Sequence, residues 1–249
     1  MRIISSKNLE LPTVSAEEMK LIDTLMIDNY HIELPQMMEN AGRNLADFTE
    51  SFLRSRGHTN HVHTVVILIG SGGNGGGGLV AARHLLNRGH TVHVISAVPR
   101  STFKPMTAHQ ASIIEAMGYT IEAVVTLPQC DLILDCLLGY SLNGDPTGSY
   151  AAIIKATNTN ATPIVSLDTP SGLDVTTGQP QNPCIKADAT MTLALPKSGF
   201  LLATAQSNLG ALYLGDISVP PSLYHQHLNI DFPDKIFFRE RVIELMLVE

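Results

Sequence analysis

Polar side chains suited to binding a small ligand follow three of the strands that the sequence predicts. Asn74 lies in a glycine-rich loop after one strand, Asp135 ends another, and Asp168 and Ser171 follow a third. Loops at the carboxyl ends of parallel strands meet at one edge of a sheet, so we expect these residues to converge. A single acidic strand end is more often a capping carboxylate. Two acidic strand ends beside a glycine turn favour a ligand-binding site. The oxygens of Asn, Asp and Ser suit a hard cation rather than zinc.

The glycine-rich loop has the layout of a phosphate-binding turn. Seven of the nine residues 70–78 are glycine, and they stand between an apolar strand at 65–69 and a helix expected at 79–87. Glycine permits positive φ and close approach to a ligand, and a helix N-terminus offers free N–H groups to an anion. The spacing G-x-G-x-x-G from Gly70 fits the dinucleotide fingerprint, although a tight turn without a ligand is the alternative.

The next strand argues against a NAD-dependent dehydrogenase. It is expected at residues 91–95 and is followed by Ser96-Ala-Val-Pro. Ordinary dinucleotide-binding folds have an acidic residue near this point, which holds the ribose hydroxyls. That residue is missing from this sequence.

The elements that must position these residues form an α/β pattern. Two helices are expected first, one capped by Ser15 with Glu18 at its third position, the other beginning near Pro35. Strands and helices then alternate from residue 63 to about 170, which predicts a Rossmann-like, doubly wound, mostly parallel sheet with helices on both faces.

The chain is expected to form a single domain over residues 1–249, with its core at about 15–220. Further strands are expected near 189–195 and 211–214. The tail 221–249 has no assigned role, and residues 237–247 are expected to form a terminal helix.

Composition narrows the class of protein. A net charge of −7 disfavours nucleic acid and acidic membrane surfaces as partners. Three cysteines without a CxxC pair fit a reducing compartment, so we expect a cytoplasmic location. No apolar stretch is long enough to predict a transmembrane span, and the N-terminal residues lack the apolar core of a signal peptide.

Two further features each allow two interpretations. His58, His61 and His63 precede the first parallel strand, at the end opposite the expected site. A solvated cluster is favoured over a metal site, because no acidic or cysteine partner is near in sequence. Lys197 lies just past a strand end, where it either faces the site or is a solvated surface lysine.

In the order and spacing of its motifs, the sequence resembles the NAD(P)H-hydrate epimerase family, also called the YjeF N-terminal domain, over residues 15–220. The segments that carry the resemblance are Met38-Glu-Asn-Ala-Gly42, Gly78-Leu-Val-Ala-Ala-Arg-His-Leu85, Asp135-Cys-Leu-Leu-Gly139, Ser166-Leu-Asp-Thr-Pro-Ser-Gly-Leu-Asp174, Pro196-Lys-Ser-Gly199 and Gly215-Asp-Ile-Ser-Val-Pro220. Each segment is modest alone, and together they are specific.

The resemblance implies an isomerase that repairs a damaged cofactor. Hydration of NADH or NADPH at nicotinamide C6 gives two epimers, and the family interconverts them. It implies a potassium ion at Asn74, Asp135 and Ser171, and Asp168 as general base or acid. The substrate-binding residues that it implies are Gly73, Asn74, Gly75, Gly76, Gly77, Gly139, Tyr140, Ser141, Leu142, Asn143, Gly144, Asp145 and Asp168.

The implied partners are small molecules and proteins of the same repair system. They are hydrated NADH or NADPH, a separate dehydratase that restores only one epimer, and a second copy of the chain in a homodimer. Neither nucleic acid nor a membrane is expected.

The glycine turn departs from the family pattern, G-x-G-N-N-G-G-D-G, at two positions. Gly73 replaces the first asparagine and Gly77 replaces the aspartate. A lost charged hydrogen bond costs about 1.5–3 kcal/mol, or roughly a tenfold to hundredfold loss of affinity. These losses motivate the alternative of a non-catalytic nucleotide-binding or scaffold protein on the same fold.

Overall fold

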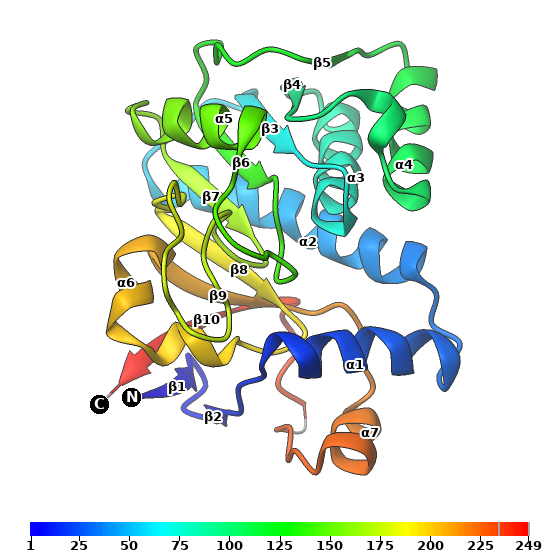
Figure 1. Ribbon diagram of the computed structural model, residues 1–249, viewed down its shortest axis with the longest axis vertical. Helices are drawn as coiled ribbons and strands as arrows, with labels where there is room; N and C mark the ends of the chain where they lie inside the picture. Colours follow the sequence, from blue (N-terminus) through cyan, green and yellow to red (C-terminus); the bar gives the residue numbers. More distant parts are fainter. Residues whose placement is uncertain (234, 249) are drawn as a thin grey trace.

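The computed structural model describes residues 1–233 and 235–248, whose strands form one ten-stranded sheet (Figure 1). The parallel strands, in spatial order, are β5 (Ile121–Glu122), β4 (Thr91–Ser96), β3 (Thr64–Ile69), β6 (Leu132–Cys136), β7 (Ile164–Leu167), β8 (Ala189–Leu193) and β9 (Ala211–Gly215). Antiparallel β10 (Val242–Val248), β1 (Arg2–Ser5) and β2 (Glu10–Leu11) complete the edge beyond β9. The strand order reverses between β3 and β6, and such a switch point is where α/β sheets bind ligands.

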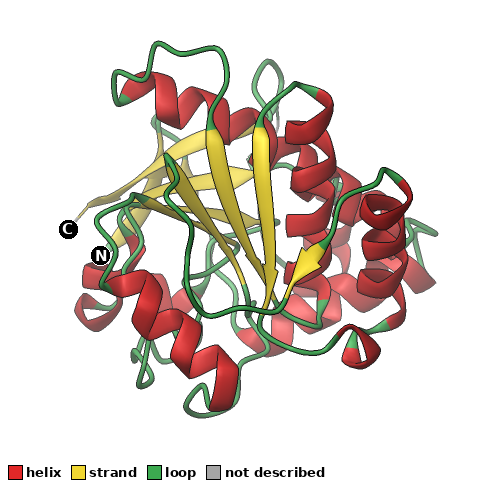
Figure 2. Ribbon diagram, turned by 90° about the horizontal axis from the view of Figure 1, so that it is seen from above, coloured by secondary structure: helices red, strands yellow, loops and turns green. Residues whose placement is uncertain are grey.

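Helices cover both faces of the sheet (Figure 2). The helices are α1 (Ala16–Asp28), α2 (Leu34–Ser55), α3 (Gly73–Asn87), α4 (Pro105–Ala116), α5 (Gly148–Asn158), α6 (Ala203–Leu209), α7 (Pro221–Leu223), the 3-10 helices η1 (Arg100–Thr102) and η2 (Ser198–Leu201), and the π-helix η3 (Tyr224–Leu228). Along β3, Val65 and Ile67 pack in one core with α2, α3 and α4, whereas Val66 and Leu68 pack in another with α5. The predicted doubly wound α/β fold is confirmed.

The first two helices begin where the sequence predicts. The Ser15 hydroxyl accepts a hydrogen bond from the Glu18 N–H at 3.2 Å, and the Glu18 carboxylate accepts one from the Ser15 N–H at 2.7 Å. This reciprocal pair satisfies two N–H groups at the start of α1. In α2, Pro35 lies in the first turn, where its missing N–H costs nothing.

The glycine-rich stretch differs from its prediction. Helix α3 begins at Gly73 rather than at residue 79, and none of the glycines at 70–78 has positive φ. Close packing explains them instead. A Cβ on Gly75 would lie 2.1 Å from the Gly70 carbonyl oxygen, and one on Gly76 would lie 2.5 Å from the Met38 side chain. The first turns of α3 therefore approach β3 and α2 at a distance that only glycine allows.

The predicted terminal helix at residues 237–247 is wrong. This part of the chain contains β10, which pairs with β9 and β1. Ile243 and Leu245 are buried whereas Glu244 and Met246 are exposed, which is the period of two that a strand with one covered face produces. The strands β1 and β2, which sequence reasoning did not predict, extend the same edge.

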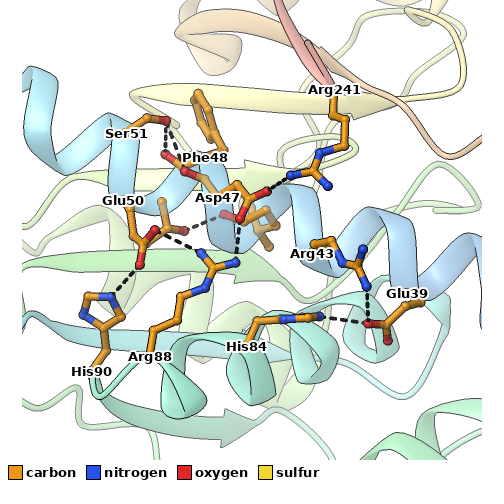
Figure 3. Close-up of polar contacts among 12 residues, drawn as sticks. Glu39, Arg43, Asp47, Phe48, Glu50, Ser51, His84, Arg88, His90 and Arg241 are labelled. Carbon is orange, nitrogen blue, oxygen red and sulfur yellow. Dashed lines mark hydrogen bonds and ion pairs between the residues drawn. The ribbon is translucent and has the colours of Figure 1, made fainter. Parts of the chain in front are cut away.

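Ion pairs connect α2 to α3 and its C-terminal end, and to the residue that precedes β10 (Figure 3). Asp47 accepts hydrogen bonds from Arg88 at 2.5 Å and from Arg241 at 2.7 Å, and Glu50 accepts one from Arg88 at 3.0 Å. Glu39 pairs with Arg83 and with His84. These side chains are partly exposed, so each pair contributes about 0–1 kcal/mol and the network mainly orients α2 against α3.

The histidine cluster is only partly solvated. His61 is exposed, but His63 is buried and its ring stacks on His90 with a centroid distance of 5.6 Å. Burial, followed by the neighbouring His90, lowers the pKa of His63, which favours a neutral ring. Within the described residues, no group of three or more His, Cys, Asp or Glu is placed to hold a metal ion. Nor is any described helix both long and apolar enough to span a bilayer.

Candidate functional site

A cavity of about 470 Å³ opens at the carboxyl edge of the sheet, at the switch point between β3 and β6. The loops after β3, β6 and β7 converge there, as the sequence predicts, and α1, α2 and the ends of β8 and β9 complete the walls. The lining residues are Met19, Asp23, Leu34, Met37, Met38, Ala41, Ser71, Gly72, Gly73, Asn74, Gly77, Lys104, Leu137, Leu138, Gly139, Tyr140, Ser141, Tyr150, Leu167, Asp168, Leu193 and Ile217.

The predicted substrate-binding residues divide into two groups by position. Those that line the cavity are Gly73, Asn74, Gly77, Gly139, Tyr140, Ser141 and Asp168. Gly75 and Gly76 lie behind the wall, packed on Gly70 and on Met38. Leu142, Asn143, Gly144 and Asp145 lie beyond the lining, where Asp145 accepts a hydrogen bond from the Asn182 N–H at 2.9 Å. The substrate-binding roles of both groups of residues remain predictions.

Asp168 lines the cavity and has one of its two carboxylate oxygens hydrogen-bonded. Its backbone lies in the left-handed region, with φ of 65°, directly after β7. Oδ1 accepts hydrogen bonds from the Lys197 ammonium at 2.7 Å and from the Leu193 N–H at 3.2 Å. Oδ2 has no hydrogen-bond partner among the described residues. An aspartate held in a sparsely populated backbone conformation with one free oxygen is suited to proton transfer.

Lys197 is not a solvated surface lysine. It is 0% exposed, and its ammonium also donates to the Thr192 hydroxyl and to the carbonyl oxygens of Leu193 and Leu195, at 2.9–3.0 Å. The backbone on both sides of the lysine is bound by Val14, whose N–H donates to the Pro196 carbonyl and whose carbonyl accepts from the Ser198 N–H. The lysine therefore fixes the orientation of the Asp168 carboxylate from behind.

The three predicted metal ligands are connected through hydrogen bonds below the cavity floor. Asp135 is fully buried and accepts bonds from the hydroxyls of Ser166 and Ser171 and from the Ser171 N–H, at 2.6–2.8 Å. Burial raises the pKa of Asp135, and its bonds from Ser171 and Ser166 oppose that rise. The Ser171 hydroxyl contacts the Leu138 carbonyl, which also accepts from the Asn74 amide at 3.0 Å. Asp135 thus joins the loops after β6 and β7.

Asp23 is a cavity residue that the sequence analysis missed. It comes from α1, and its Oδ2 accepts a hydrogen bond from the Tyr140 hydroxyl at 2.6 Å. Burial raises the pKa of Asp23, and the charge of Asp168 raises it further, while Tyr140 and Lys197 oppose the rise. The sequence contained a signal. Asp23 is four residues after Met19 and three before Met26, so it borders the apolar face of the helix.

Comparison with known proteins identifies the family. A family model described as "YjeF-related protein N-terminus" matches residues 34–199.

The chain belongs to this family.

Curated relatives agree with that membership and have names that describe an activity. A protein named NAD(P)H-hydrate epimerase from Dehalogenimonas lykanthroporepellens is 37% identical over 90% of this chain and 89% of its own length. One of the same name from Rhodopirellula baltica is 32% identical over 91% of this chain and 92% of its own length. A protein from Moorella thermoacetica named bifunctional NAD(P)H-hydrate repair enzyme Nnr is 34% identical, with the match covering 42% of its length.

A solved structure shares the YjeF-related fold. The crystal structure of yeast ynu0 aligns with a TM-score of 0.77 and 23% identity, over 94% of this chain and 100% of that one.

The two departures from the YjeF-related turn differ in their surroundings. A Cβ on Gly73 would meet no atom within 4 Å, whereas one on Gly77 would lie 2.8 Å from Cδ2 of Leu167. Leu167 is a buried core residue that also lines the cavity. Its side chain therefore fills the space into which a residue at position 77 would extend.

We expect Gly77→Asp to destabilise the protein by about 1–3 kcal/mol, because the new side chain overpacks against Leu167. Gly73→Asn should change the free energy of unfolding by less than about 0.5 kcal/mol, since its side chain enters open space. Thermal unfolding of the two variants measures the difference. Adding Leu167→Val, which removes the contacting carbon, should restore most of the stability of Gly77→Asp. Equal melting of the two single variants would contradict this packing argument.

Proposed function

We propose that this chain is a NAD(P)H-hydrate epimerase, an isomerase that interconverts the C6 epimers of hydrated NADH or NADPH. The observation that carries the proposal is the free Oδ2 of Asp168 in a cavity at the switch point, beside the glycine-rich start of α3. The names of the two relatives that the chain covers almost fully support it.

The cavity has the features that a dinucleotide requires. Gly72 precedes α3 without a capping side chain, and it lines the cavity together with Gly73 and Asn74, so this uncapped helix start suits a pyrophosphate. Exposed Lys104, also in the lining, adds a positive charge beside this turn. Apolar side chains such as Met19, Leu34 and Met37 form a wall suited to flat rings.

A potassium ion fits the donor set that the family resemblance implies. Asn74, Asp135 and Ser171 offer amide, carboxylate and hydroxyl oxygens, and the Leu138 carbonyl lies among them. Carbonyl and hydroxyl oxygens with one carboxylate suit a hard cation of low charge. Bound there, the ion would add positive charge under the cavity floor and help to neutralise the pyrophosphate.

Asp168, Lys197 and Asp135 have separate roles in the proposed reaction. Lys197 keeps Oδ1 of Asp168 engaged, so that Oδ2 is directed to the substrate and exchanges a proton with the C6 hydroxyl as it leaves and returns. The buried Asp135 aligns the loops after β6 and β7 that carry the rest of the cavity floor.

The biological setting follows from the same proposal. The epimerase would act in the cytoplasm, alone or as a homodimer, and supply the repairable epimer to a dehydratase. The name of the bifunctional Moorella relative supports such a link.

Purified protein is expected to accelerate equilibration of the epimers of hydrated NADH, followed by chromatography. Replacing potassium with lithium at the same ionic strength should slow the reaction about tenfold, which corresponds to about 1.4 kcal/mol of barrier. Absence of acceleration by the wild-type protein in potassium would refute the epimerase.

The loss of two polar side chains at Gly73 and Gly77 favours a second candidate, a non-catalytic nucleotide-binding or scaffold protein. It predicts saturable binding of the hydrated cofactor without epimerisation. Calorimetric titration beside the rate assay therefore separates the two functions.

A further inference from the structure

Two carboxylates in the cavity share an unusual arrangement. Asp168 has Oδ1 bound to Lys197 and Oδ2 free, and Asp23 has Oδ2 bound to Tyr140 while Oδ1 has no hydrogen-bond partner among the described residues. Each residue lines the cavity. Each is therefore a carboxylate whose orientation is fixed through one oxygen while the other remains available to a ligand.

The two carboxylates approach the cavity from separate parts of the fold. Asp168 follows β7 at the edge of the sheet, whereas Asp23 belongs to α1, which packs on residues just beyond β8 and β9 (Figure 1). Both line one cavity, and the charge of Asp168 raises the pKa of Asp23, so the two groups lie near one another. Lys197 pairs with Asp168, whereas the hydrogen-bond partner of the Asp23 carboxylate among the described residues is the neutral hydroxyl of Tyr140.

Tyr140 is suited to hold Asp23 as a donor. Burial raises the pKa of Tyr140, and the charge of Asp23 raises it further, so the phenol stays protonated at neutral pH. A protonated phenol can only stabilise the carboxylate by donating to it. Tyr140 therefore positions Asp23 without competing for its proton.

The epimerase proposed above needs two proton-transfer groups, because the hydroxyl leaves one face of the ring and returns to the other. We propose that Asp168 and Asp23 serve opposite faces of the substrate ring at C6, with Tyr140 as the positioning residue of Asp23. This inference rests on the proposed function.

Epimerisation at C6 needs one of the two carboxylates to be protonated and the other to be ionised. The C6–O bond breaks with its electron pair on oxygen, which takes the proton of the carboxylic acid on that face and leaves as water. The ring nitrogen lone pair forms the N1=C6 double bond of an iminium ion. Water on the opposite face then gives a lone pair to C6, the π electrons return to nitrogen, and the second carboxylate takes a proton from that water. The reverse reaction starts from this protonation state.

The test compares inversion at C6 with oxygen exchange, using each purified epimer of hydrated NADH in water enriched in oxygen-18. The wild type should invert both epimers and label the inverted product. With Asp23→Asn, the epimer whose hydroxyl faces Asp168 should still exchange its oxygen while its inversion falls roughly 10²–10⁴-fold. The other epimer should neither exchange nor invert.

Two variants complete the design. Asp28→Asn makes the same change at an exposed position of α1 and should match the wild type in both rates. Tyr140→Phe should reduce inversion roughly tenfold to a hundredfold and spare exchange in the same epimer as Asp23→Asn. The ratio of exchange to inversion does not depend on the fraction of folded protein, so partial unfolding of a variant cannot imitate the effect.

Inversion by Asp23→Asn at the rate of Asp28→Asn would overturn the role of Asp23 and leave the epimerase intact. A parallel fall of exchange and inversion for both epimers would overturn the assignment of the carboxylates to opposite faces. Failure of the proposed function has a separate signature, because the wild type itself would then accelerate neither process.

Discussion

Asp168→Ala is expected to abolish epimerisation and to destabilise the protein. In the proposed reaction Asp168 exchanges a proton with the C6 hydroxyl, so its loss should lower the rate by the roughly 10²–10⁴-fold that such groups contribute. Stability falls because Lys197, which is fully buried, loses its carboxylate partner. Breaking a buried ion pair costs about 3–5 kcal/mol, or roughly 6–20 °C in melting temperature for a chain of this size. Epimerisation rates and thermal unfolding measure the two effects.

A double variant separates them. Asp168→Ala combined with Lys197→Met removes the stranded charge and leaves an apolar side chain in its place, which often restores the stability lost with a buried pair. The double variant should therefore melt close to the wild type and remain inactive. If it recovered activity, Asp168 would have no part in proton transfer. If Asp168→Ala alone had the melting temperature of the wild type, the ion pair with Lys197 would not contribute to the stability of the fold.

Asp135→Ala is expected to lower both stability and activity by a different route. The side chain is fully buried and binds the Ser166 hydroxyl together with the N–H and hydroxyl of Ser171. Its removal leaves buried donors unsatisfied, at about 1–3 kcal/mol for each, so we expect a loss of about 3–5 kcal/mol overall. Activity should fall in the fraction that remains folded, because the loops after β6 and β7 lose their common anchor. Chemical denaturation and the epimerisation rate give the two quantities.

Ser166→Ala is the matched control for Asp135→Ala. It removes one donor and leaves Asp135 with its bonds from Ser171, so about 1 kcal/mol of stability should be lost and activity should largely persist. Equal destabilisation by the two variants would show that the contact with Ser166, rather than the junction of two loops at Asp135, supports this part of the fold.

The convergence of the three loops was predictable from sequence because topology alone dictates it. Strands that alternate with helices form parallel pairs, and parallel strands place their following loops at one edge. Asn74, Asp135 and Ser171 meet at that edge through direct hydrogen bonds and through the Leu138 carbonyl. The capping box at Ser15 was predictable because both of its partners are local.

Features that depend on distant packing were not predictable. Helix α3 begins among glycines of low helix propensity, since Gly75 and Gly76 meet neighbours that would exclude any side chain. The burial of Lys197 depends on Asp168 and on Val14, which only the fold brings close to it, in addition to oxygens of the neighbouring residues Thr192, Leu193 and Leu195. Likewise β10 has residues that also suit a helix, and its pairing with β1 and β9 decides its conformation.

The two backbone hydrogen bonds of Val14 help to define which part of the chain is needed to build the site. The segment that matches the family model begins at residue 34 and ends at 199. A fragment cut at those limits would keep Asp168 and Lys197 but lose Val14, which binds the chain on both sides of the lysine, and Asp23, which lines the same cavity as Asp168. It would also lack β9 and β10. The limits of the family model therefore enclose Asp168 and Lys197 without Val14, which holds the segment around the lysine, and without Asp23.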